Sequence, residues 1–151
     1  GSGSLVQVLG PRFGLTALWS PDGSKILASF TTSQTGKNLN LALFDAAGKE
    51  LYQLPVATIA DKCAWLPDSK DAYCAIPKET PPNTIWPDSY FRGELVASDR
   101  IVDISATTGD VSPVLDEGTL AISNLFMTKD NATLFFINRI DGTLWRYKVK
   151  E

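Results

Sequence analysis

The sequence predicts an all-β fold built from repeated four-stranded antiparallel units. Apolar residues alternate or cluster in short runs, such as Lys25–Phe30 and Leu39–Phe44, as is typical of strands. Turn-forming pieces such as Pro21–Gly23 and Asp141-Gly142 separate these runs. No long stretch has a convincing 3.6-residue period, so we expect helix to be a minor component.

Three units follow one another along the chain. The strands expected in the first unit are one that ends at Trp19, Lys25–Phe30, Leu39–Phe44 and Glu50–Leu54. Those of the second are one that ends at Trp65, Ala72–Ile76, Arg100–Ile104 and Val111–Leu115. Those of the third are one that ends at Met127, Thr133–Ile137 and Leu144–Val149.

The hairpin between the first two strands carries the repeat. The segment that begins at Trp19 aligns with the segment that begins at Trp65, 46 residues later, and less well with the one at Met127, a further 62 residues on. In each copy a turn follows the large residue, with Asp22, Asp68 or Asp130 in it, listed in chain order. An Asp side chain accepts hydrogen bonds from nearby backbone amides, which favours such turns. We therefore assign these three carboxylates to turns rather than to a metal site.

The third unit lacks a fourth strand, and Leu5–Leu9 stands where the fourth strand of a preceding unit would lie. Gly1–Ser4 has the composition of an expression scar and is set aside. We therefore expect a closing strand over residues 5–9, a first unit over 15–55, a second over 61–116 and a third over 120–149. The units are circularly permuted.

Four-stranded antiparallel units that repeat every 40–60 residues are typical of β-propeller blades. The Trp19–Leu27 segment resembles the repeat of TolB-like propellers, which are related to WD-repeat propellers. Trp65–Ser69 is a good second match, and Lys129–Asn131 is a degenerate third. The resemblance implies blade structure and no activity, because the family includes binding scaffolds, periplasmic partner-docking proteins and non-catalytic domains of peptidases.

Three blades are too few to close a ring, since propellers have typically four to eight. We expect a homodimer with six blades, in which the strand Leu5–Leu9 of each chain adds to the third blade of the other. The residues expected at this seam are Leu5, Val6, Val8, Leu9, Trp145 and Tyr147. Three copies with nine blades, or an excised or engineered half of a longer propeller, are the alternatives.

The two cysteines flank the second hairpin. If its turn centres between Asp68 and Ser69, Cys63 and Cys74 lie directly opposite each other on adjacent strands. They form either a structural disulfide or two small buried thiols. A disulfide would favour an extracytoplasmic bacterial location, periplasmic or surface, because such bonds persist in oxidising compartments.

A long insertion, residues 77–99, separates the second and third strands of the second unit. Long loops on a rigid scaffold are often functional, and this one carries aromatic and charged residues. The binding candidates are Trp86, Asp88, Tyr90, Phe91 and Arg92. We expect a protein or a small ligand at the channel mouth; alternatively, the aromatic side chains fold back over the rim of the blade.

Composition excludes several classes of function. The chain has no histidine, which removes Ser-His-Asp and Cys-His nucleophiles and most zinc sites. Its net charge of −3 and its lack of a basic cluster argue against a nucleic-acid partner, and no apolar run is long enough for a membrane span. We therefore expect no catalytic residues, no metal and no cofactor. A glycan-processing enzyme built on carboxylates is the alternative, with Glu79, Asp88, Glu94 or Asp99 as candidate acids.

Overall fold

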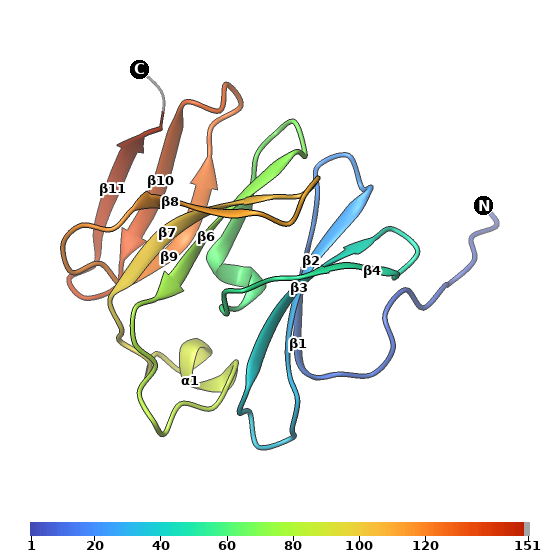
Figure 1. Ribbon diagram of the computed structural model, residues 1–151, viewed down its shortest axis with the longest axis horizontal. Helices are drawn as coiled ribbons and strands as arrows, with labels where there is room; N and C mark the ends of the chain where they lie inside the picture. The colour runs from blue at the N-terminus through green and yellow to red at the C-terminus, as the bar shows by residue number, and fades with distance from the viewer. Residues whose placement is uncertain (150–151) are drawn as a thin grey trace.

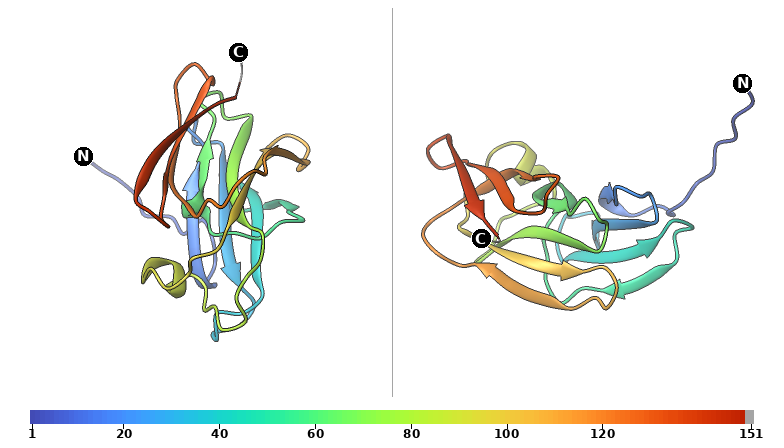
Figure 2. Two further views of the ribbon diagram at one scale, coloured as in Figure 1. Left: turned by 90° about the vertical axis from the view of Figure 1, so that its left-hand side faces the viewer. Right: turned by 90° about the horizontal axis from the view of Figure 1, so that it is seen from above.

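Three antiparallel sheets lie side by side in an arc (Figure 1, Figure 2), in a computed structural model that describes residues 1–149. The sequence predicts one domain over residues 5–151, and its last two residues, 150 and 151, lie outside the described residues. The first sheet contains β1 (Phe13–Trp19), β2 (Lys25–Thr31), β3 (Leu39–Asp45) and β4 (Glu50–Gln53). The second contains β5 (Cys63–Trp65), β6 (Asp71–Pro77), β7 (Asp99–Ser105) and β8 (Val111–Leu115). The third contains β9 (Ile122–Met127), β10 (Thr133–Asn138) and β11 (Thr143–Lys148).

The strands pair in the order that the repeat predicts. Neighbouring strands in each sheet follow the chain order, and every pairing is antiparallel. The repeat is also one of register: Trp19 pairs with Ile26, Trp65 with Ala72 and Met127 with Leu134. Within residues 1–149, helix is confined to two short pieces, the 3₁₀ turn η1 (Ala60–Lys62) and α1 (Asp88–Phe91). The all-β prediction is therefore confirmed.

The hairpin turns use their Asp residues as expected. The Oδ1 atoms of Asp22, Asp68 and Asp130 each accept a hydrogen bond from the backbone N–H two residues further on, at 2.9, 3.0 and 3.1 Å. In the third turn Asn131 adopts a φ of +59°, as an Asn tolerates. The same local chemistry thus closes the hairpin in all three sheets.

Two apolar interfaces hold the sheets together. Between the first and second sheets, Leu27 and Leu43 pack against Cys74 and Ile104. Between the second and third, Tyr73 and neighbouring residues of the second sheet pack against the third. The strands β1, β5 and β9 form the inner edge of the arc, where η1 contacts both β1 and β9. Each sheet therefore packs face to face on the next, as propeller blades do.

The segment Leu5–Leu9 forms no strand among the described residues. Leu5 and Val6 are exposed, whereas Val8 and Leu9 pack against the face of the first sheet that points away from the second. A strand needs a partner edge for its backbone groups, and within one chain this segment has none. Its pairing with a second chain stays a prediction.

Candidate functional site

The insertion folds back over the end of the second sheet. Trp86 and Tyr90 are buried together with Ile59 and Leu95 in a small apolar cluster. These two aromatic side chains therefore have the alternative arrangement given above, in which they fold back over the rim of the blade. They therefore hold the insertion in place and are not available to a ligand.

Backbone contacts attach the insertion to the first sheet. The Trp86 N–H donates to the Gly36 carbonyl at 3.0 Å, and a Cβ on Gly36 would lie 2.6 Å from the Ile85 side chain. The Lys37 ammonium donates to the carbonyls of Pro82 and Thr84 at 3.0 and 2.8 Å. The two loops can approach this closely only because residue 36 is a glycine: its φ is +71°, and it has no Cβ to collide with Ile85.

A second set of contacts attaches the insertion to the third sheet. The Arg139 guanidinium lies 4.3 Å from the centre of the Tyr90 ring and donates to the Tyr90 carbonyl at 3.0 Å. Cation–π contacts of this kind are favourable, the more so when partly desolvated. The insertion therefore bridges all three blades on one face of the arc.

A buried ion pair lies beside the Tyr90 ring. The Lys62 ammonium donates to both carboxylate oxygens of Asp99 at 2.7 Å, and Asp99 also accepts from the Ile122 N–H at 2.7 Å. Burial raises the pKa of Asp99 and lowers that of Lys62, and the opposite charge of each partner works against these shifts. Asp99, one of the candidate acids, thus joins the second and third sheets.

The exposed residues of the insertion include Asp88, Phe91, Arg92 and Glu94. The Phe91 side chain is 55% exposed, and the Arg92 guanidinium lies 3.5 Å from the Glu94 carboxylate. Three of the five predicted binding candidates therefore face solvent. No group of three or more acidic or cysteine side chains that could hold a metal occurs within residues 1–149.

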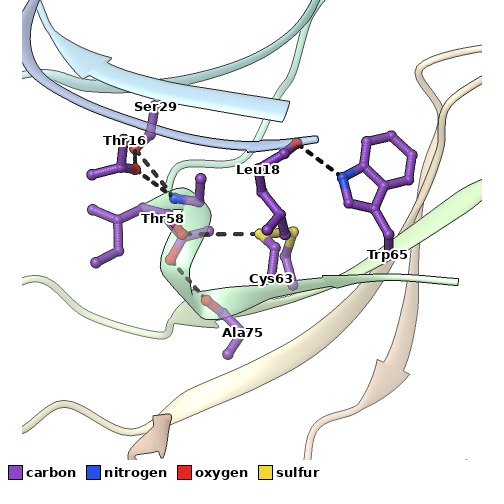
Figure 3. Close-up of a disulfide and its surroundings, with 10 residues drawn as sticks. Thr16, Leu18, Ser29, Thr58, Cys63, Trp65 and Ala75 are labelled. Atoms are coloured by element: carbon purple, nitrogen blue, oxygen red, sulfur yellow. Dashed lines mark hydrogen bonds between the residues drawn. A yellow bond between two sulfur atoms is a disulfide. The ribbon is translucent and has the colours of Figure 1, made fainter. Parts of the chain in front are cut away.

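The disulfide is confirmed. Cys63 and Cys74 pair across β5 and β6 with their Cα atoms 4.0 Å apart, and their sulfurs are bonded. Figure 3 shows this bond at the junction between the first two blades, where the Trp65 indole N–H donates to the Leu18 carbonyl at 3.0 Å. Beside it the Thr58 hydroxyl donates to the Ala75 carbonyl at 2.8 Å. The bridge therefore supports the surface on which the first blade packs.

The open face of the first blade carries the N-terminal segment. Its apolar residues Ile26, Ala28, Ala42 and Phe44 are buried, and Val8 and Leu9 pack against them. The Arg12 guanidinium lies 5.1 and 5.2 Å from the ring centres of Phe30 and Phe44.

Gly48, in the turn between β3 and β4, admits the carbonyl of Val8, with which any Cβ at this position would collide. At the next junction, a Cβ on Gly109 would lie 2.7 Å from the Tyr52 ring of the fourth strand β4. The Tyr52 hydroxyl also donates to the Thr107 carbonyl at 2.7 Å. Val8 therefore lies on the first blade where a fourth-strand residue of a preceding blade would lie.

The Tyr147 side chain points away from the open face of the third blade, and the role of its strand β11 in the seam stays a prediction. The Tyr147 hydroxyl donates to the Val114 carbonyl at 3.3 Å, so its side chain belongs to the junction between the second and third blades. Trp145, two residues away on β11, shares that face because alternate side chains of a strand point the same way. The opposite, open face carries Phe126 and Leu144, which are 59% and 71% exposed. Sequence alternation identifies the two faces but not which of them meets the second blade.

Among the described residues, no strand pairs with the outer edge of β11, because the third sheet has the order β11-β10-β9. The arc thus ends in two apolar faces and one unpaired strand edge. No helix in the described part of the chain is long and apolar enough to cross a bilayer.

Comparisons with known proteins identify the fold. No protein-family model and no curated protein matches the chain. The chain is similar in structure to TolB from Acinetobacter baumannii, with a TM-score of 0.61 and 16% identity over 93% of this chain and 31% of that one. It is also similar to the β-propeller domain of the Trilobed protease from Pyrococcus furiosus, which has an open velcro topology (TM-score 0.60, 13% identity, 92% of this chain and 40% of that one).

A third similar structure is an oligogalacturonate lyase in complex with manganese (TM-score 0.56, 17% identity, 87% of this chain and 36% of that one). The chain spans less than half the length of each of these proteins. At these identities the likeness concerns the fold alone. The chain therefore has the fold of the TolB-like β-propellers, of which it contains three blades.

Proposed function

We propose that the chain is a non-catalytic binding module that completes its ring with a second copy of itself. One observation carries this proposal. Val8 lies over Gly48 of the first blade in the same way as Tyr52 lies over Gly109 of the second. The first blade holds a segment in the position of a fourth strand, and the third blade has an edge, β11, that lacks one. Each copy would supply what the other lacks.

Two copies give six blades in a closed C2 assembly. A two-fold arrangement makes both seams identical, and closure removes the unpaired strand edge and the two exposed faces. The limited share of each similar structure that the chain covers, 31–40%, supports an arc that is part of a larger ring. A different solution mass would indicate one of two other arrangements. These are a nine-bladed trimer and a ring closed by further blades of a longer chain.

Ligand binding is assigned to the face that carries the insertion. In a C2 ring the two insertions lie at the same channel mouth, and each presents Asp88, Phe91 and Arg92 to solvent. Aromatic and arginine side chains on a rigid scaffold are the residue types that most often dominate binding energy. Two hollows of about 470 and 270 Å³ flank the pair Pro81-Pro82 and offer space for a small ligand beside this surface.

The proposal assigns no catalytic role to the candidate acids. Of the four candidate acids, Asp99 is engaged by Lys62, and Glu94 lies beside Arg92. The likeness to an oligogalacturonate lyase concerns the fold and gives no residue of this chain a role. The disulfide supports an oxidising, extracytoplasmic location.

Prolines in the donated strand test the proposal. Val6→Pro with Val8→Pro removes two backbone donors from residues 5–9, so the double variant is expected to be a folded monomer. The control is Ser2→Pro with Ser4→Pro, which adds the same two prolines to the chain just before the strand. Size-exclusion chromatography with light scattering measures both. A dimer that persists in the first variant would refute closure by strand exchange.

A further inference from the structure

The junction between the first two blades is a template for the junction that would close the ring. Trp19 pairs with Ile26, which pairs with Phe44, just as Trp65 pairs with Ala72 and Ala72 with Ile104. The two tryptophans therefore hold the same place on equivalent faces of the first and second blades. The face of the second blade is packed against a neighbouring blade, whereas the face of the first carries the N-terminal segment and leaves Trp19 exposed.

The two tryptophans differ only in their surroundings. Trp65 is 8% exposed and donates from its indole N–H to the Leu18 carbonyl of the preceding blade (Figure 3). Trp19 is 48% exposed. A large exposed tryptophan at the edge of an apolar face is typical of an interface anchor.

The register of the strands identifies the acceptor. Leu18 directly precedes Trp19 at the end of β1, and Phe126 directly precedes Met127 at the end of β9. The pairs Leu18 with Leu27 and Phe126 with Phe135 are equivalent in the two sheets. Phe126 therefore occupies the same position on the open face of the third blade as Leu18 occupies on the packed face of the first.

We infer that Trp19 anchors the ring, its indole N–H donating to the main-chain carbonyl of Phe126 in a second copy. This inference rests on the proposed self-assembly and names the contact that would fix its register. The Trp19 ring would pack on the exposed Phe126 side chain as Trp65 packs on the first blade. At the junction between the second and third blades the equivalent residue is Met127, whose side chain has no N–H to donate. The contact therefore distinguishes the closing junction from that one.

Substitutions at Trp19 test the inference in a dilution series. The closed dimer contains this contact twice, once at each seam. Trp19→Phe keeps a ring but removes the donor, so the dimer dissociation constant is expected to rise about 25-fold, or about 5-fold for each contact. Trp19→Ala removes the anchor, and a rise of about 900-fold or more is expected, or about 30-fold for each contact. The control is Val96→Ala, which truncates a similarly exposed apolar side chain on the insertion and should leave the constant unchanged. Far-UV circular dichroism checks that each variant folds.

A second measurement uses the wild-type chain. The indole N–H signal of Trp19, assigned by its loss in Trp19→Phe, should exchange slowly with solvent in the dimer and rapidly after dilution. A wild-type dimer that Trp19→Ala does not weaken, or in which this N–H exchanges rapidly, would refute the anchor and leave strand exchange standing. A wild-type chain that is monomeric at every concentration would refute both.

Discussion

Gly48 offers a direct way to separate the N-terminal segment from the first blade. A Cβ at this position collides with the Val8 carbonyl, so Gly48→Ala is expected to displace Val8 and Leu9 from the apolar face that they cover. Both side chains are half-buried, and half of the usual transfer energy of a valine or leucine is about 1 kcal/mol each, or about 2 kcal/mol together. This contact lies within one chain, so the loss falls on the stability of the monomer. The dimer should also weaken, because the segment would no longer be held in place to pair with β11 of a second copy.

The control must account for backbone strain. Gly48 has a φ of +87°, at which alanine costs about 1–2 kcal/mol whatever its neighbours. Gly118→Ala imposes a similar strain, because its φ is +67°, but a Cβ there would meet nothing within 4 Å. Gly48→Ala should lose about 2 kcal/mol more stability as a monomer than Gly118→Ala, measured by urea unfolding, because it also displaces Val8 and Leu9. Only Gly48→Ala should dimerise more weakly, measured by sedimentation equilibrium.

Equal dissociation constants for the two variants would refute the reasoning, because they would show that the docked segment contributes nothing to assembly. Gly109→Ala provides the complementary result. It places the same added atom against Tyr52 at a junction within one chain. It should therefore lower the stability of the monomer beyond the cost of its φ.

Three further predictions concern the stability of the blades. Replacing Cys63 and Cys74 by alanine should lower the free energy of unfolding by about 2.8 kcal/mol on the chain-entropy estimate for the 11-residue separation, measured by urea unfolding; an unchanged midpoint would contradict this. Lys62→Met leaves the Asp99 carboxylate buried without its cation and should lower the free energy of unfolding by about 3–5 kcal/mol at neutral pH. The double variant Lys62→Met with Asp99→Leu is the matched comparison, and its loss of stability should be smaller. Hydrogen bonds from Ser20 and Ser24 hold the pKa of Asp22 below its usual value, so its contribution is present above pH 4 and lost at lower pH; Asp22→Asn should flatten the acid limb of a stability–pH curve, and an equally steep limb would contradict this.

The strands and the disulfide could be predicted from the sequence because their signals are local. Side chains alternate along a strand, and a hairpin turn sets the register, so counting outward from Asp68 and Ser69 pairs Cys63 with Cys74. The same counting identified the repeat of Trp19 and Trp65, which the structure shows as equivalent pairings.

The contacts of the insertion could not be predicted in this way. Lys62 with Asp99, and Tyr90 with Arg139, join segments that no periodic pattern relates to each other. Burial of Trp86 and Tyr90 depends on the approach of the loop to Gly36, which only the folded chain shows. The face of the third blade on which Tyr147 lies could have been predicted by extending the repeat alignment to the third strands.

The central claim is that two arcs close one ring, and the mass of the chain in solution tests it most directly. Light scattering on a size-exclusion column, repeated over a dilution series, should give about twice 16.4 kDa at high concentration and a smaller mass as the dimer dissociates. A well-folded species of 16.4 kDa at every concentration would contradict the account, and a mass of about three times that value would replace the six-bladed ring with a nine-bladed one.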